Sequence, residues 1–275
     1  MSHRVLPGFP LAISAMGFWL LAIVLLPLAS VFVEGFSYSA KDFFWAVASP
    51  RVLSALRLTF GVTAAAALAA GFLGFLLAWV LVRYSFFGHE LVDALIDLPF
   101  SLPTAVSGLA LTALYTKDGW LGEPLSHLGI KVAYTPLGIG IALFFVGLPF
   151  VVRALQPVLQ EFNPEIEEAA ASLGASRPQT FIRVVLPSLG PAIATGFSLA
   201  FARGLGEYGS VVFIAGNIPY FSEIAPLLIM GRIEQFDYGG ATALASVMLL
   251  LAFAILWVIN RLQTVYRKRI AEKTA

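Results

Sequence analysis

Long stretches without a single Asp, Glu, Lys or Arg dominate this 275-residue sequence. A helix needs about 20 mostly apolar residues to cross the hydrocarbon core of a membrane. Six charge-free stretches reach about that length, over residues 5–33, 58–82, 98–116, 132–152, 184–202 and 238–260. The pattern predicts an all-α polytopic membrane protein with six transmembrane helices, and it excludes an ordinary soluble domain.

The prolines and charges that flank these stretches set the expected helix boundaries. We expect membrane helices over approximately residues 11–33, 58–82, 98–116, 136–154, 188–212 and 239–260. The first stretch is too long for the core of a signal peptide, so we interpret it as a retained helix. The sequence thus predicts a single transmembrane domain over residues 1–275, with a cytoplasmic loop over 157–187.

The composition and the absence of catalytic and phosphate-binding motifs exclude several classes of function. Hydrophobic residues make up 59% of the chain and charged residues 12%, whereas soluble domains have about 25% charged residues. The net charge of +1 indicates no nucleic-acid partner, and membrane lipid is the expected surrounding. Cysteine is absent, the three histidines lie far apart, and no Gly-Lys dipeptide provides a phosphate-binding loop. We therefore expect no enzyme, no metal site and no cofactor in this chain.

The distribution of basic residues favours one orientation in the membrane. With six helices, both termini lie on one side, and ten of the 17 Lys and Arg residues fall in the segments on that side. Most of the bias comes from Arg267, Lys268 and Arg269, with Arg4 near the other end of the chain. Because cytoplasmic segments are enriched in Lys and Arg, we expect cytoplasmic termini.

The expected helices over 98–116 and 188–212 contain residues that a plain membrane helix lacks. Pro99 and Pro103 remove backbone donors and bend the chain, and lipid cannot satisfy the freed carbonyl groups. That segment should therefore either pack against protein or line a substrate path. Arg203 and Glu207 are four residues apart and share one helix face, where they either neutralise each other or line a path.

A glycine motif in the expected helix over 188–212 resembles a nucleotide-binding signature. Residues 204–209 match G-x-G-x-x-G, but no βαβ unit is possible within an apolar membrane segment. We interpret these glycines as a flexible or closely packed part of the fifth helix.

The loop between the fourth and fifth stretches is the most informative segment. Asn163 is suited to cap a helix, Pro164 to begin it, and Gly174 to end it. Ser176 then suits the start of a second helix that runs toward Pro187. The loop is predicted to form a helical hairpin. This hairpin is either a surface element without a partner or a docking element for a cytoplasmic protein.

This loop resembles the EAA motif of binding-protein-dependent ABC importer permeases. The matching residues are Glu168, Ala169, Ala170, Gly174, Leu186 and Pro187, with Val184 where the motif has Ile. The resemblance implies the type I importer fold, with a coupling helix that sits in a groove of a separate ATPase subunit. It assigns ATPase coupling, through residues 163–187, to Glu168, Ala169, Ala170 and Gly174, and we add the neighbouring Glu165 and Glu167.

Further segments resemble the oxyanion branch of that family, and most of all the sulfate/thiosulfate permeases of the T type. They are residues 97–109, 119–122, 206–210, 215–219, 222–229, 234–238 and 240–243. The resemblance implies a W-type permease partner, two copies of an ATPase that hold ATP and Mg²⁺, a periplasmic sulfate/thiosulfate-binding protein, and location in the bacterial inner membrane.

Candidates for the translocation path are Pro103, Thr104, Ser107, Arg203 and Glu207, because a dianion needs a polar route. Two alternatives stay open. One is a molybdate or tungstate permease of the same architecture, and the other is a secondary anion transporter that acts alone.

Overall fold

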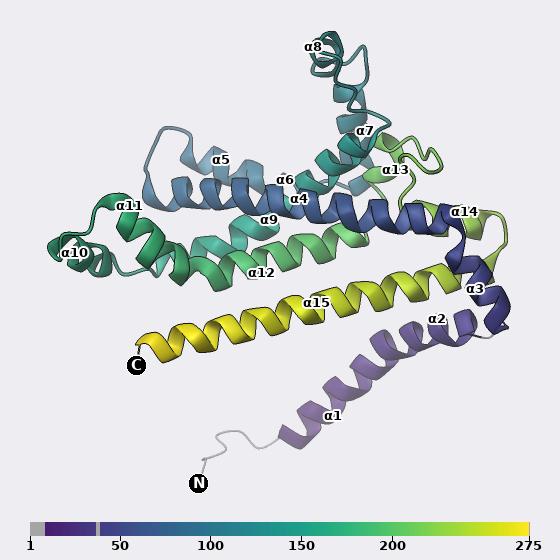
Figure 1. The fold of residues 1–275 in the computed structure, drawn as a ribbon, viewed down its shortest axis with the longest axis horizontal. Helices are drawn as coiled ribbons and strands as arrows, with labels where there is room; N and C mark the ends of the chain where they lie inside the picture. The colour runs from purple at the N-terminus through teal and green to yellow at the C-terminus, as the bar shows by residue number, and fades with distance from the viewer. Residues whose placement is uncertain (1–8, 37–38, 275) are drawn as a thin grey trace.

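A computed structural model of the protein describes residues 9–36 and 39–274, so that Arg4 lies outside the described residues. All regular elements of the described part are helices (Figure 1). They are α1 (Phe9–Leu20), the π-helix η1 (Leu21–Leu25), α2 (Leu26–Phe36), α3 (Ala40–Ala48), α4 (Pro50–Arg83), α5 (His89–Ile96), α6 (Leu98–Ser101), α7 (Thr104–Tyr115), α8 (Gly122–His127), α9 (Pro136–Gln160), α10 (Pro164–Ser172), α11 (Arg177–Thr180), the π-helix η2 (Phe181–Val185), α12 (Leu186–Leu205), α13 (Val211–Ile214), α14 (Ala225–Glu234) and α15 (Tyr238–Thr274).

Five helical segments of the described part are long and apolar enough to cross a membrane. They span Leu11–Gly35, Pro50–Arg83, Pro136–Gln160, Arg177–Leu205 and Tyr238–Val265. Each overlaps one of the stretches expected from the sequence. The remaining expected stretch, 98–116, contains no helix of that length, and its longest helix is the apolar α7.

The helix expected over 98–116 is interrupted, so it forms α6 and α7 instead of one continuous element. Leu102 has an extended backbone and Pro103 occupies the N-cap position of α7. Helical geometry is sterically disfavoured for a residue that precedes proline, which is consistent with the break at this point. The predicted bend is therefore present, but it divides the segment into two short helices.

The fifth expected helix, 188–212, also ends earlier than the sequence suggested. α12 stops at Leu205, and a turn over residues 206–210 leads into the short α13. Gly206 takes the C-cap position, although the spacing of Arg203 and Glu207 on either side of it also suits a continued helix. At its other end the same helix begins earlier, because α11, η2 and α12 follow one another without a gap.

The core is built where α4, α9 and α12 pack against one another. Small residues recur every fourth position along the buried face of α4, at Ala66, Ala70, Gly74 and Ala78. A Cβ atom on Gly74 would come within 2.9 Å of Val151 Cγ1 in α9. Small side chains at this spacing thus let the two helices approach closely.

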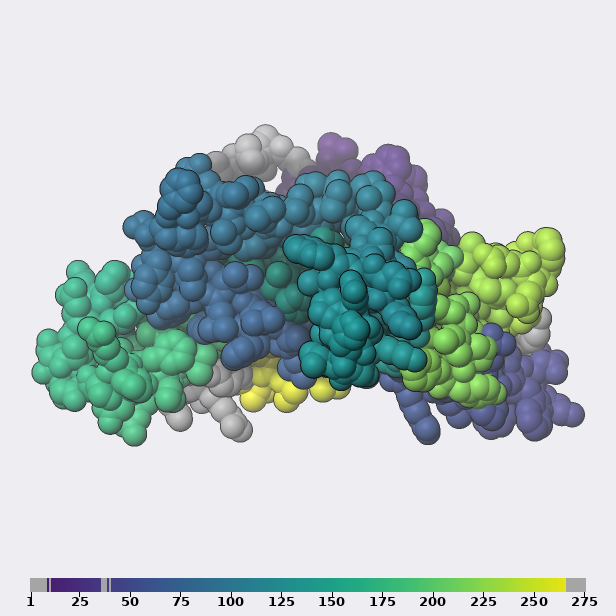
Figure 2. Space-filling model, turned by 90° about the horizontal axis from the view of Figure 1, so that it is seen from above, coloured from purple at the N-terminus to yellow at the C-terminus, as the bar shows by residue number. Residues whose placement is uncertain are grey.

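The long helices place different segments at opposite ends of the molecule. α10 and α11 lie at one end, where α15 also terminates, and α3 and α14 lie at the other (Figure 1). α8 projects from the body beyond α7 (Figure 1), and Figure 2 looks onto this projection from above. The span Leu11–Gly35 has no buried residue in its most apolar window, and α2 contacts α15.

Candidate functional site

α10 has the helix signals that the sequence predicted. The side chain of Asn163 caps the helix, with its Oδ1 atom accepting a hydrogen bond of 3.0 Å from the Glu165 amide. Gly174 follows the helix with φ of +83°, a left-handed conformation that glycine adopts without strain. The chain can therefore reverse sharply after α10 and enter α11.

A second cap begins the return helix at the predicted position. The amide of Ser176 donates a hydrogen bond of 2.9 Å to Gln179 Oε1, as part of a capping box. From here α11, η2 and α12 form one helical segment, Arg177–Leu205. The hairpin is thus joined directly to a membrane-spanning helix, with no flexible linker between them.

The outer face of α10 is unusually apolar for an exposed helix. Ile166, Ala169 and Leu173 are all exposed, and Leu173 is 89% exposed. Their spacing of three and four residues places them on one face. Glu165, Glu168 and Gly174 are also exposed. The helix therefore presents an apolar stripe with acidic neighbours, a surface suited to contact with another protein.

The inner face of α10 is anchored to the end of α4, a contact that the sequence analysis missed. Glu167 Oε1 forms an ion pair with the Nη2 atom of Arg83, the last residue of α4. The Arg83 guanidinium also lies over the Trp79 ring, 5.0 Å from its centroid, and 5.8 Å from that of Phe162. Of the predicted coupling residues, Glu167 thus points into the permease, whereas Glu165 and Glu168 point outward.

Aromatic packing extends this anchor to the return helix. The rings of Trp79 and Phe181 meet edge to face, with centroids 5.5 Å apart, and Phe75 lies 6.1 Å from Phe181. Phe181 belongs to η2. Both arms of the hairpin are therefore fixed against the same end of α4.

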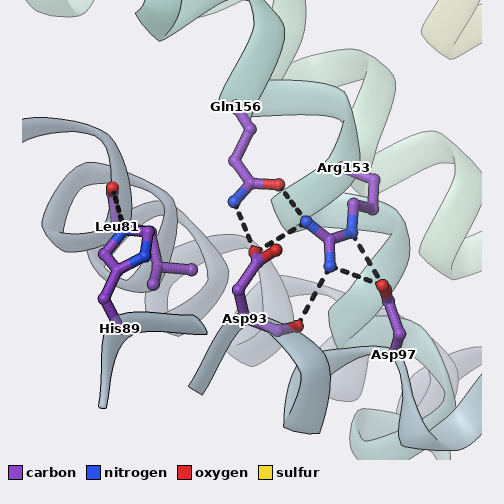
Figure 3. A network of polar contacts seen from close by, with 6 residues as sticks. All are labelled: Leu81, His89, Asp93, Asp97, Arg153 and Gln156. Carbon is purple, nitrogen blue, oxygen red and sulfur yellow. Dashed lines mark hydrogen bonds and ion pairs between the residues drawn. The ribbon is translucent and has the colours of Figure 1, made fainter. Parts of the chain in front are cut away.

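A second polar network joins α5 to α9 near the same end of the molecule (Figure 3). Arg153 donates to both carboxylates of Asp93 and Asp97, at 2.7 Å and 2.5 Å, and also to the Asp93 carbonyl oxygen. Gln156 completes the network by donating to Asp93 at 2.9 Å. The hydrogen bond from Arg153, followed by that from Gln156, holds the pKa of Asp93 below its ordinary value.

Two residues of the predicted path, Arg203 and Glu207, form a compact polar cluster with Ser210 at the end of α12. Glu207 is only 1% exposed, and its Oε2 atom lies 2.5 Å from Arg203 Nη1. Its other oxygen accepts hydrogen bonds of 3.0 Å from both the amide and the hydroxyl of Ser210. The carboxylate is thus fully paired, and the cluster fixes the turn that follows α12.

The remaining path candidates lie on α7, which packs against that turn. A Cβ atom on Gly108 would come within 2.7 Å of Ser210 Cα, and one on Gly209 within 3.0 Å of Thr104 Cβ. Ser107 is buried, Thr104 is half-buried and Pro103 is exposed. The structure therefore brings all five candidates into one region, where Gly204 and Gly209 allow close packing and Gly206 has open space around it.

The described residues include no group of three His, Cys, Asp or Glu side chains placed to hold a metal ion. The polar clusters pair arginines with carboxylates, an arrangement that holds helices in position.

Solved structures define the class of protein. The fold matches a bacterial ABC transporter involved in the import of the acidic polysaccharide alginate, with a TM-score of 0.74 over 93% of this chain and 94% of that one, at 17% identity. A bacterial alginate ABC transporter in complex with alginate pentasaccharide-bound periplasmic protein gives a TM-score of 0.73 over 92% of each chain, at 19% identity. The architecture is therefore that of an ABC importer permease.

The family follows from the sequence match. Residues 70–272 match the model of the binding-protein-dependent transport system inner membrane component, and the chain belongs to this family. It is accordingly a multi-pass membrane transport subunit and not an enzyme.

Among the relatives, the Sulfate transport system permease protein CysT of Escherichia coli (strain K12) is 46% identical over 98% of this chain and 97% of its own length. The probable sulfate transport system permease protein cysT of Nephroselmis olivacea is 49% identical over 91% of this chain and 88% of its own.

Proposed function

We propose that this chain is one transmembrane subunit of an ATP-driven importer of sulfate and thiosulfate. The observation that carries the proposal is the 46% identity to a sulfate permease over 98% of the chain. The match runs through the membrane helices and the hairpin, and is not confined to one motif.

The proposed partners follow from the family and from the exposed surfaces. An ATPase subunit, present in two copies, binds ATP and Mg²⁺ and receives α10 through the apolar stripe of Ile166, Ala169 and Leu173. A W-type permease completes the path, and a periplasmic binding protein delivers the anion. The C-terminus faces the cytoplasm, since α15 ends at the same end of the molecule as α10 (Figure 1), and the distribution of basic residues favours the same side for the N-terminus.

The mechanism is alternating access driven from the hairpin. ATP-driven closure of the ATPases displaces α10, and the Arg83–Glu167 ion pair transmits the displacement to α4. The segment Arg177–Leu205 carries it to Arg203, roughly 40 Å away at 1.5 Å per residue. The cluster of Arg203, Glu207 and Ser210 therefore moves with the hairpin and changes the outer part of the path.

Uptake of labelled sulfate by a permease-deficient strain that expresses this chain with its partner subunits tests the proposal. We expect uptake that requires the ATPase and that excess thiosulfate, but not excess molybdate, suppresses. Strong suppression by molybdate alone would reassign the substrate to molybdate or tungstate. Uptake into proteoliposomes that lack the ATPase would instead identify a secondary anion transporter.

A further inference from the structure

A cavity of about 580 Å³ lies in the projection formed by α8 and its flanking loops. Its lining includes three basic side chains, Lys117, His127 and Lys131, and no acidic side chain. Thr116 and Ser126 also line it, but their hydroxyls donate to the carbonyl oxygens of Ala113 and Glu123. The basic side chains therefore make the cavity complementary to a small anion.

The lysines have no internal partner that would neutralise them. Among the ion pairs of the described residues, neither Lys117 nor Lys131 takes part, although Asp118 and Glu123 belong to the same projection. Both lysines are exposed, so their charge is available to a ligand that enters the cavity. Elsewhere in the protein, Arg83, Arg153, Arg203 and Arg51 each pair with a carboxylate.

The walls of the cavity are fixed by backbone contacts, so the pocket exists before a ligand binds. The Leu121 amide donates to the Leu114 carbonyl oxygen at 3.1 Å, and the Ile130 amide to that of Leu125 at 2.9 Å. Gly122 packs so tightly on Thr116 that a Cβ atom would overlap its carbonyl oxygen. A preformed site requires less ordering on binding than a flexible loop.

The cavity is also connected to the proposed path. The Tyr134 amide, on its rim, donates a hydrogen bond of 2.7 Å to the Ile214 carbonyl oxygen at the end of α13. α13 directly follows the turn that holds Glu207 and Ser210. Figure 2 shows the projection next to the segment around residues 205–235. An anion in the cavity would therefore lie beside the outer part of the path, at the end opposite to α10.

We infer that this cavity is an oxyanion-binding site, which holds a small tetrahedral dianion through Lys117, Lys131 and His127 before the anion enters the path. The inference rests on the proposed function for the identity of the anion. The cavity raises the local concentration of the substrate where the binding protein releases it, and it needs only weak affinity to do so.

Protection of the lysines from chemical acylation tests the site in the complete transporter, reconstituted without binding protein. The acylation rates of Lys117, Lys131 and the exposed Lys41 of α3 are measured by mass spectrometry, in sulfate and in chloride of equal ionic strength. We expect sulfate to slow acylation of Lys117 and Lys131 at least threefold and to leave Lys41 unchanged. Equal rates in both salts would overturn the site.

A second arm separates a free oxyanion from a carboxylate of the binding protein. Protection that appears only when anion-free binding protein is added would assign the cavity to protein docking and overturn the inference. In transport, Lys117→Gln with Lys131→Gln should raise the half-saturating concentration for sulfate several-fold, with Lys41→Gln as the matched control. Failure of the proposed function shows separately, as absent uptake by the unaltered transporter.

Discussion

Glu167, in the middle of α10, forms an ion pair with Arg83, the residue that ends α4. The two residues are 84 positions apart in sequence and are the main polar link between the hairpin and the membrane core. Arg83 is further held by the faces of Trp79 and Phe162. Displacement of α10 must therefore pull on α4 as well as on α12.

Loss of this ion pair should loosen the mechanical link without unfolding the core. We expect Glu167→Gln to weaken the hairpin by about 1–2 kcal/mol, because one charge-assisted hydrogen bond is lost at a partly exposed site. Sulfate transported per ATP hydrolysed should fall several-fold in proteoliposomes that contain the complete transporter. Glu161→Gln is the control, since Glu161 is exposed and takes part in no ion pair of the described residues. An unchanged ratio would show that the pair does not transmit motion.

Gly174 should tolerate no β-branched side chain, because its φ of +83° places it in the left-handed region. Gly174→Val should therefore distort the turn between α10 and α11, uncouple ATP hydrolysis from uptake and leave membrane insertion intact. The comparison is Gly231→Ala in α14, where no neighbouring atom lies within 4 Å of a Cβ. Normal uptake and coupling in Gly174→Val would contradict the assignment of α10 as the coupling helix.

The network around Arg153 should make the transporter sensitive to acid. The pKa of Asp93 is lowered in the folded protein, so its stabilising effect is present at neutral pH and is lost as pH falls below its ordinary value of about 3.9. The thermal unfolding temperature in detergent should drop as pH falls through this range, and Asp93→Asn should flatten part of the drop. Glu90→Gln, in the same helix α5, serves as control. Identical pH profiles for Asp93→Asn and the unaltered protein would remove Asp93 from the acid response.

Contact between α7 and the turn after α12 should depend on Gly108. A side chain there would collide with the backbone of Ser210, which is fully buried. Gly108→Val should destabilise the protein by about 1–3 kcal/mol through overpacking and should reduce uptake with it. Gly61→Ala in α4 provides the control, because its Cβ would meet no atom within 4 Å. A thermal unfolding temperature for Gly108→Val equal to that of the control would show that α7 can shift without cost.

Structural features that depend on residues close together in the sequence could be predicted, and contacts between residues far apart in the sequence could not. α10 and its caps were predictable because Asn163, Ser176 and Gly174 act on neighbours within a few positions. The early end of α12 at Leu205 was not, because Gly206 and Glu207 are compatible with a continued helix as well as with its end.

Contacts between distant segments left no local signal. Arg153 meets Asp97 across 56 positions and Arg51 meets Glu223 across 172, and each residue alone resembles an ordinary charge at a helix end. A single sequence gives no means of choosing among such partners. Only Arg203 and Glu207 were paired from the sequence, because four positions on one helix place them on the same face.

The continuous helical segment from Arg177 to Leu205 fixes the rotation of Arg203 about the helix axis as well as its distance from α11. Each residue added to a helix turns everything beyond it by about 100°. An insertion of one residue in this run would therefore rotate Arg203 away from its present bearing relative to α11, even if every side chain were kept. Insertions and deletions should therefore be tolerated better in the exposed loop over 216–221 than anywhere in this helix, where they would change the rotational phase of Arg203.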